Sequence, residues 1–298
     1  MDITYSFIIP HRNSPNLLNR CLDSIPLRSD LEIIVVDDNS EINKKPVIKR
    51  PDTTVILLKA QESKWAGHAR NVGMKKAKGK WLLFADADDF YNAGFLDVLD
   101  KYSDKEIDVL YFNADSCDSE TLKKTSRNDK LNHLISEYDG SKQSEEALKY
   151  LIHAPWNKMF NHSFVVKHKI CFEEIIKGND VQFGHLAGYF ARKINIEKTP
   201  LYVTTCSKYS MSFTKKRPIE SYVCSAEMKI KLNYFYQYIG HEEWKNNKSW
   251  LRYIVRVLID QGVIFGFKFL LAFYNRMKER NTFENRYVEL INNYSFTK

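Results

Sequence analysis

The sequence lacks the cysteine pattern of a disulfide framework or of a zinc site. Its five cysteines are odd in number, scattered, and never arranged as a C-x-x-C pair. This spacing favours a protein of a reducing compartment. The first residues contain no basic segment ahead of an apolar core, so we expect no secretory signal peptide. Internal repeats and low-complexity tracts are also missing, and we expect a cytoplasmic globular protein.

A long uninterrupted apolar run is missing as well. The most apolar stretch, residues 250–280, is broken by Asp260 and Lys268 and weakened by two glycines, so it does not predict a membrane span. It does show roughly helical apolar spacing, in the row Ile254, Val257, Leu258, Phe265, Phe269 and Phe273. Two interpretations stay open: a packed helical appendage, or a helix whose apolar row rests on a membrane surface.

The charge of the chain is unevenly distributed. From residue 215 to the end there are 15 Lys and Arg against 8 Asp and Glu, which accounts for +7 of the formal net charge of +8. A basic region of this kind is attracted to anionic membrane surfaces or to nucleic acid. Because no nucleic-acid-binding module is visible and the charges alternate with apolar residues, we expect peripheral contact with the inner face of the cytoplasmic membrane and no nucleic-acid partner.

Short apolar runs alternate with helical patterns over the first half of the chain. Strands are predicted at 5–10, 31–38, 54–58, 80–85 and 108–113, with helices at 15–24, 67–78, 94–102 and 144–153. Strands that are apolar throughout and alternate with helices predict a parallel sheet covered on both faces. Residues 115–140 are polar and aperiodic, and are predicted to form a long irregular loop. We expect an α/β catalytic domain at 1–214 and a basic, aromatic helical extension at 215–298.

Acidic side chains follow two of the predicted strands. Asp37 and Asp38 come after "IIVV", and three more acids, Asp86, Asp88 and Asp89, come after "WLLFA". In open parallel sheets, ligands bind beyond the carboxyl ends of the strands. Turn and cap roles would explain one acid at each place but not three within four residues, because close carboxylates repel one another. The triple acid therefore predicts Mg²⁺ or Mn²⁺ that binds together with a phosphorylated ligand.

Four blocks, "FIIPHRN", "IIVVDDNS", "GHARNVGMKKAKGKWLLFADADD" and "APWNKMF", resemble family 2 glycosyltransferases in order and spacing. The resemblance covers residues 5–212 and implies a GT-A fold, a Rossmann-like mixed, mostly parallel sheet flanked by helices. It implies that Asp38 binds the nucleotide base, Asp86 faces the ribose, and Asp88 binds the metal. Asp89 would act behind the metal ligand or cap a helix. The implied nucleotide site also includes Pro10, Arg12, Asp37 and Arg70.

The resemblance also implies a catalytic base. Inverting glycosyl transfer requires an acceptor hydroxyl to lose its proton as it attacks the anomeric carbon, and a positioned carboxylate serves that step. The family usually carries a Glu-Asp pair beyond the "WNK" block, whereas this chain has Asn179 followed by Asp180. We expect Asp180 to be the base. A helix-capping role for Asn179 or Asp180 is the alternative, and both roles are compatible.

Two further departures from the family pattern affect the donor side. In the closing motif, Thr204 and Thr205 stand where an aromatic residue and an arginine are usual, so Lys208 or Arg12 is expected to contact the donor phosphates. The first motif has His11 and Arg12 where an apolar residue and a tyrosine are usual. Contacts with the acceptor or donor are expected from the "WNK" block and the closing motif, namely from Trp156, Asn157, Lys158 and Lys208.

The leading hypothesis is a metal-dependent inverting glycosyltransferase of the hexosyl or N-acetylhexosaminyl type. The expected donor is a nucleoside diphosphate sugar, in the first place a UDP-sugar, and the acceptor is a hydroxyl of a saccharide or of a lipid-linked molecule in capsule, exopolysaccharide or lipopolysaccharide synthesis. Nucleotidyl transfer would require a glycine-rich loop, which "IIPHRNSPNLL" does not provide. A non-catalytic nucleotide-sugar-binding or scaffold protein remains the alternative, because Asn179 replaces an acid.

Overall fold

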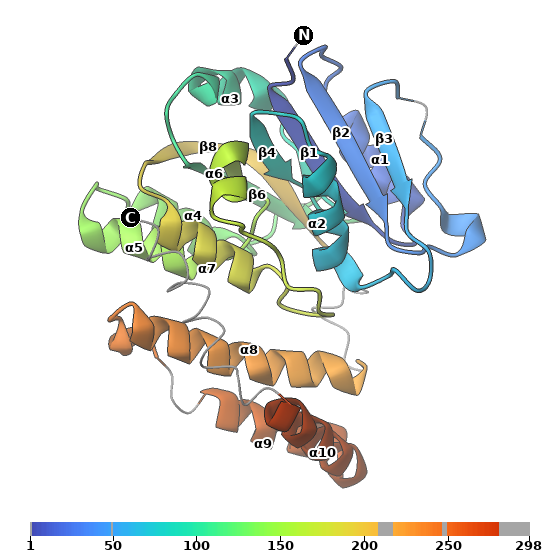
Figure 1. The fold of residues 1–298 in the computed structure, drawn as a ribbon, viewed down its shortest axis with the longest axis vertical. Coiled ribbons are helices and arrows are strands. Elements are labelled where there is room, and N and C mark those ends of the chain that lie inside the picture. The colour runs from blue at the N-terminus through green and yellow to red at the C-terminus, as the bar shows by residue number, and fades with distance from the viewer. Residues whose placement is uncertain (1, 49, 208–216, 246–248, 280–298) are drawn as a thin grey trace. The chain divides into compact units, whose positions relative to one another are not determined.

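The computed structural model describes residues 2–48, 50–207, 217–245 and 249–279 (Figure 1). These residues fall into two compact units. The first comprises residues up to 213 except 176–178, and the second comprises 176–178 together with residues from 214 onward. The predicted domain boundary at residue 214 lies outside the described residues and stays a prediction. Each unit is described below by itself.

The first unit is built on a sheet of eight strands, in the order β3-β2-β1-β4-β7-β6-β8-β5. Its strands are β1 Tyr5–His11, β2 Leu31–Asp37, β3 Thr53–Leu57, β4 Trp81–Phe84, β5 Phe90–Tyr91, β6 Val109–Asp118, β7 Lys158–Asn161 and β8 Ile194–Cys206. Strands β1 to β4 form one parallel block, and β6 pairs in parallel with β8. Strand β7 runs antiparallel to both β4 and β6, and β5 runs antiparallel to β8. The predicted α/β class with a mixed, mostly parallel sheet is confirmed.

Helices cover both faces of this sheet. They are α1 Pro15–Asp23, α2 Trp65–Lys76, α3 Phe95–Ser103, α4 Asp129–Ser136, α5 Lys142–Leu151, α6 His162–Lys167 and α7 Val181–Phe190, with a short 3₁₀ helix at Ile42–Lys44. Alternate side chains of β1 and β4, such as Phe7 and Leu83, join α1 and α3 in one core. The opposite face packs on α2 and α7, which lie in front of the sheet in Figure 1. Period-two side-chain alternation thus builds two cores from one set of apolar strands.

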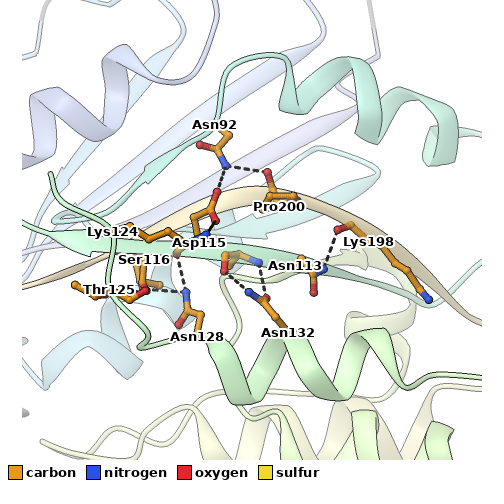
Figure 2. A network of polar contacts seen from close by, with 12 residues as sticks. Asn92, Asn113, Asp115, Ser116, Lys124, Thr125, Asn128, Asn132, Lys198 and Pro200 are labelled. Atoms are coloured by element: carbon orange, nitrogen blue, oxygen red, sulfur yellow. Dashed lines mark hydrogen bonds and ion pairs between the residues drawn. The ribbon is translucent and has the colours of Figure 1, made fainter.

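The segment 115–140 differs from the irregular loop that its polar composition predicts. Strand β6 continues to Asp118, and helix α4 follows after a turn. Figure 2 shows why: the Asn128 side chain donates to the Asp115 carbonyl at 2.7 Å, and the Asn132 side chain pairs with both backbone groups of Ala114 at 2.9 and 3.0 Å. Thr125 and Ser116 add a hydroxyl pair at 2.8 Å. Polar side chains that bond to strand backbone hold this segment in place, and such bonds leave no apolar period in the sequence.

The second unit is helical. It contains α8 Ile219–Tyr238, a 3₁₀ helix at Glu242–Trp244, α9 Ser249–Gln261 and α10 Val263–Glu279. Its core includes Tyr222, Val223 and Ala226 of α8, Ile254 and Val257 of α9, and Phe269 of α10. Among the residues that the structure describes, no helix combines the length and apolar character that crossing a membrane requires.

This core corrects one prediction about the carboxyl-terminal helices. The row that was a candidate for membrane contact packs inside the unit: Ile254, Val257 and Phe269 are buried, and Leu258, Phe265 and Phe273 pack against them. Burying such a side chain contributes about 1.5–3 kcal/mol to stability. The row therefore stabilises the packing of α8, α9 and α10. The assignment of these residues to a membrane surface is therefore wrong.

Candidate active site

The candidate site lies in the first unit, at the carboxyl edge of the parallel block. Strand β1 lies between β2 and β4, so the segments that follow these three strands meet at one edge. They are residues 12–13 after β1, 38–40 after β2 and 86–89 after β4, and the last residues of β1 and β2, His11 and Asp37, lie beside them. This is the edge at which open α/β sheets bind their ligands.

Asp37 is fully buried and its carboxylate is occupied by the protein itself. Ser14 donates its backbone N–H to Nε2 of His11, so His11 donates from Nδ1 to Asp37 Oδ1 at 2.7 Å. The Ser40 backbone N–H and hydroxyl donate to the two oxygens of Asp37 at 3.0 and 2.5 Å. These bonds tie the β1 and β2 loops together. Pro10, also buried, lies within β1 opposite Val36.

Asp38 is buried too, but one of its oxygens is left without a partner. Its Oδ2 accepts the backbone N–H of Trp65 at 3.1 Å and lies 3.7 Å from Nη1 of Arg12. Its Oδ1 is buried and has no hydrogen-bond donor within the described residues. An unpaired buried carboxylate oxygen costs free energy until a donor reaches it. The structure therefore presents one hydrogen-bond acceptor for a ligand at this point.

Trp65 borders the same oxygen and holds a strained backbone conformation. Its φ is 68°, in the left-handed region that bulky residues rarely adopt, and it begins helix α2. The bond from its N–H to Asp38 stabilises this conformation. The Arg12 guanidinium lies 5.6 Å from the centre of the indole ring, whose residue is 38% exposed. Strain of this kind concentrates at functional sites, and here it places an aromatic face beside the open acceptor.

The three acids after β4 form a tight cluster. Ligand oxygens of Asp86, Asp88 and Asp89 all lie within 4.8 Å of one another. Burial and the charge of Asp86 raise the pKa of Asp88, and burial and its acidic neighbours raise the pKa of Asp89 well above its usual range. The cluster thus contains more negative charge than its surroundings neutralise, which a cation would relieve.

The three carboxylates have different partners. Asp89 accepts from the Tyr202 hydroxyl at 3.1 Å and from the Thr205 backbone N–H at 2.6 Å, so its oxygens hold the cluster to β8. Asp86 accepts from Nη2 of Arg70 at 2.5 Å. The backbone carbonyl of Asp88 accepts from Arg20 at 2.5 Å and from the Thr205 hydroxyl at 2.8 Å, which fixes the loop but leaves the Asp88 carboxylate to a ligand.

The donor set fits a hard divalent cation. Carboxylate oxygens are the ligands that Mg²⁺ and Mn²⁺ prefer, and such ions commonly take one or two carboxylates together with substrate phosphates. Asp88 is the best placed of the three because Asp86 pairs with Arg70 and Asp89 bonds to β8. The structure identifies the cluster but does not select between the two ions.

Arg70 connects this cluster with the start of α7. Its Nη1 donates to the Asn179 side-chain oxygen at 2.8 Å while its Nη2 holds Asp86. The guanidinium also lies 5.3 Å from the ring centre of Phe172. The connection requires Glu173 and Asn179 to lie close to α2, and Gly67 permits it: a Cβ there would overlap the backbone carbonyl of Glu173.

Asp180 occupies the capping position of α7 but does not cap it. No side-chain hydrogen bond runs from Asp180 to the first turn of the described helix. Burial raises the pKa of this carboxyl, whereas the positive charges of Arg70 and Lys158 oppose the rise. A carboxylate whose pKa is raised and which is close to the cluster of three acids is suited to accept a proton.

The "WNK" block lies behind this arrangement. Lys158 is buried and donates to the carbonyls of Ile152 and Ala154, and burial lowers its pKa to about 7. Asn157 is completely buried and bonds to Lys158 and to the Phe112 carbonyl. Only Trp156, which stacks on Tyr202 with ring centres 5.4 Å apart, retains partial exposure. Lys208, the fourth predicted contact, lies outside the described residues.

Comparison with known proteins identifies the family. The family model described as "Glycosyl transferase family 2" matches residues 6–167, more than half of the chain. The chain belongs to glycosyl transferase family 2. The matched range contains Asp37 and Asp38, the three acids after β4, Arg70 and the "WNK" block.

Individual relatives within family 2 share limited sequence identity with this chain. EpsH of Bacillus subtilis, which is named as a glycosyltransferase, is 25% identical over 210 residues, covering 66% of this chain and 59% of EpsH. The chain thus spans less than two thirds of that relative.

Solved structures show the same GT-A fold. The structure of TarS 1–349 of S. aureus in complex with UDP-GlcNAc matches with a TM-score of 0.58 and 21% identity, over 78% of this chain and 67% of TarS. A mannosyltransferase of Pyrobaculum calidifontis in complex with GDP-Man and Mn²⁺ matches with a TM-score of 0.57 and 16% identity, over 98% of this chain and 86% of the other.

Sequence reasoning alone missed several residues that border the candidate site. Trp65 and Arg20 carry no motif that distinguishes them from ordinary core or surface residues. Arg127 is exposed and donates to the Thr205 carbonyl at 2.6 Å, and its charge acts on both Asp88 and Asp89. The replacement of the usual arginine by Thr205 was a signal that another cation should be sought, but only the structure shows where it lies.

Proposed function

We propose that this chain is an inverting, metal-dependent glycosyltransferase that moves a hexosyl or N-acetylhexosaminyl group from a UDP-sugar to a hydroxyl of a saccharide or lipid-linked acceptor. The observation that carries the proposal is the single network in which Arg70 joins Asp86 of the acid cluster to Asn179, the neighbour of Asp180. It brings a donor-side cation site and a candidate base together. We assign the reaction to bacterial surface polysaccharide synthesis, where an acceptor on a lipid would be met at the inner membrane face.

The base of the nucleotide is proposed to bind between Asp38 and Trp65. Asp38 has one oxygen open and the other bonded to the Trp65 N–H. Uracil presents one ring N–H donor, whereas guanine presents two donors side by side that together fit a fully open carboxylate. The single open oxygen therefore favours UDP over GDP. The exposed face of Trp65 supplies a stacking surface, with Arg12 beside it.

Asp37 and Pro10 support this pocket from behind. Asp37 has its oxygens occupied by His11 and Ser40, so we infer that it shapes the loop and does not contact the nucleotide. Asp86, which Arg70 holds in place, is proposed to accept from the ribose hydroxyls. The same guanidinium keeps the start of α7 next to the donor.

The diphosphate is proposed to bind between Asp88 and Arg127. A divalent ion held by Asp88 would supply positive charge to the leaving diphosphate. Arg127, whose guanidinium is fixed by the Thr205 carbonyl, adds a second cation on the same side. We propose that Arg127 takes the phosphate-binding role for which the sequence suggested Lys208 or Arg12. The hydrogen bonds of Asn128 and Thr125 in Figure 2 keep its backbone in position.

Asp180 is proposed to take the proton of the acceptor hydroxyl. Asn179 keeps the hydrogen bond to Arg70 that positions the start of α7, and it removes a second negative charge from the pair. Asn157 and Lys158 are too deeply buried to touch an acceptor, so we infer that they support the loop before β7, and Trp156 remains the candidate for contact from this block.

A donor panel tests the function. Thermal unfolding is measured with UDP-sugars, GDP-mannose and UDP, each with Mn²⁺, Mg²⁺ or a chelator, because a ligand of the native state raises its stability. We expect stabilisation by UDP-sugars that requires the metal, followed by slow release of UDP from the stabilising donor. Stabilisation without any turnover, in the presence of saccharide and lipid-linked acceptors, would favour the scaffold alternative that Asn179 suggests.

A further inference from the structure

Helices α9 and α10 carry a second apolar face besides the one that builds their core. The residues of this face, called here the outer stripe, are Leu251, Val255, Ile259, Val263, Ile264, Phe267, Leu270, Leu271 and Tyr274. Most are spaced by three or four residues, and two adjacent pairs widen the row, so they lie along one side of each helix. The face differs from the inner one, which contains Ile254, Val257 and Phe269.

The outer stripe is strongly exposed. Ile259 is 76% exposed, Val263 86% and Phe267 70%, and all nine residues are exposed by at least 38%. Gly262, whose φ is 83°, joins the two helices, and both the last residue of the α9 row, Ile259, and the first residue of the α10 row, Val263, are exposed. Soluble proteins seldom leave an apolar surface of this extent uncovered without a binding role.

Basic side chains accompany the stripe. Arg252, Arg256 and Lys268 are exposed on the same helices. Nε of Arg256 lies 3.3 Å from Oδ2 of Asp260, one helical turn away. Residues 249–279 contain five Lys and Arg against two Asp and Glu. A second copy seated on the stripe would bring these like charges together with few acids to offset them. An anionic lipid surface offers apolar and negative groups to the same face.

We propose that the outer stripe of α9 and α10 binds the interface of an anionic membrane, with both helices lying in its plane. The described helices do not span a bilayer, so contact is confined to one leaflet. The inference deepens the proposed function, since it places the enzyme where a lipid-linked acceptor is found. It rests on the helical unit alone, and its test uses no catalytic readout.

The experiment is co-sedimentation of the full chain with vesicles of phosphatidylcholine alone or with phosphatidylglycerol, at low and high salt. The stripe variant is Ile259→Ser with Phe267→Ser. A matched control, Leu27→Ser with Val47→Ser, removes two side chains of the first unit that are 65% and 74% exposed. Calorimetric UDP binding and circular dichroism show that each variant is folded.

We expect the parent and the control to bind the anionic vesicles, and the stripe variant to bind about tenfold or more weakly. Arg252→Gln with Lys268→Gln should weaken binding by about fivefold per charge at low salt. Equal binding by the stripe variant and the parent, or binding that ignores lipid charge, would overturn the proposal. So would the absence of vesicle binding by the parent. A dimer that the stripe variant dissociates would then identify a second copy as the occupant.

Because UDP affinity is measured separately, the two proposals fail separately. A chain that binds anionic vesicles through the stripe but no nucleotide would refute the proposed function and leave the membrane assignment in place. A chain that binds UDP but does not bind anionic vesicles through the stripe would refute the membrane assignment and leave the proposed function in place.

Discussion

The two units use apolar side chains in different ways. In the sheet-containing unit, Phe7 and Ile8 of one central strand point to opposite faces, and helices cover both of them. In the helical unit, one face of α9 and α10 is buried on α8, and the other, with Ile259 and Phe267, is exposed. The comparison shows that an apolar pattern reveals how many faces need partners but does not say which partner each face receives.

The largest expected effect concerns the catalytic side of the first unit. Asp180→Asn should lower turnover by about 10²–10⁴-fold, because the amide accepts no proton, and should leave UDP affinity near that of the parent. Steady-state kinetics with a saturating UDP-sugar measures the change. Asp104→Asn, the same change at a fully exposed aspartate without a proposed role, is the control. If Asp180→Asn stays within a few-fold of the parent, the base is another acid, with Glu173, Glu174 and Asp89 the next candidates.

The pH profile of the parent sharpens the same assignment. The base must be deprotonated to act, so turnover should rise with pH and level off above the pKa of Asp180. Burial raises that pKa, so the rise should lie at higher pH than the ordinary aspartate value of about 3.9. The acid limb should disappear in Asp180→Asn. If turnover of the variant still rose over the same pH range, the rise would belong to a group other than Asp180.

The second effect tests the two faces of the helical unit directly. Phe269→Ala removes a fully buried ring from the inner face and should cost about 3–5 kcal/mol of that unit's stability. Ile259→Ser, on the outer stripe, should change it by about 0.5 kcal/mol or less. Hydrogen exchange of α8 to α10 measures both. Similar losses for the two variants would mean that the outer stripe is covered and would remove the contrast between the faces.

A third and smaller effect concerns nucleotide choice. Asp38→Asn replaces one of the two carboxylate oxygens by an NH2 group, which must then face one of two donors, the Trp65 N–H or the uracil N–H. UDP affinity should fall about tenfold to a hundredfold, the worth of a hydrogen bond to a charged group. Calorimetry with UDP and GDP measures it, with Glu106→Gln, a distant surface acid, as control. A variant that kept its affinity and its preference for UDP would place the base elsewhere.

The smallest effect is expected at Arg127. Because this guanidinium is exposed, Arg127→Gln should weaken UDP binding by only about two- to fivefold at low salt and should leave uridine binding unchanged. Lys124→Gln, on the same segment, is the matched control and should change neither. An equal loss of affinity for UDP and uridine would show that Arg127 supports the pocket without contacting the diphosphate.

Much of the first unit could be predicted from sequence because its signals are local. The apolar runs of β1, β2 and β4 and the acids that follow them identified the sheet and the edge where Asp38 and Asp88 lie. The order of the strands, with β1 between β2 and β4, is what brings those segments together, and the structure supplies it.

Other features depend on contacts between distant residues. Helix α4 was missed because Asn128 and Asn132 hold it to β6 through side-chain bonds that leave no apolar period. The burial of Lys158, whose ammonium bonds to backbone carbonyls, contradicts the exposure that its charge suggests. In α9 and α10 two apolar rows overlap in sequence, and only the position of α8 shows that the row containing Phe269 is the buried one.

The central claim, a nucleotide site completed by a metal on Asp88, is tested most directly by calorimetry of UDP binding with Mn²⁺ and with a chelator, in the parent and in Asp88→Asn. In the parent, the chelator should weaken binding by about tenfold or more, because an ion held by Asp88 would supply positive charge to the diphosphate. Asp88→Asn should bind UDP as weakly as the chelated parent, with no response to Mn²⁺. A variant that bound UDP as the parent does, or a parent that ignored the chelator, would contradict the account.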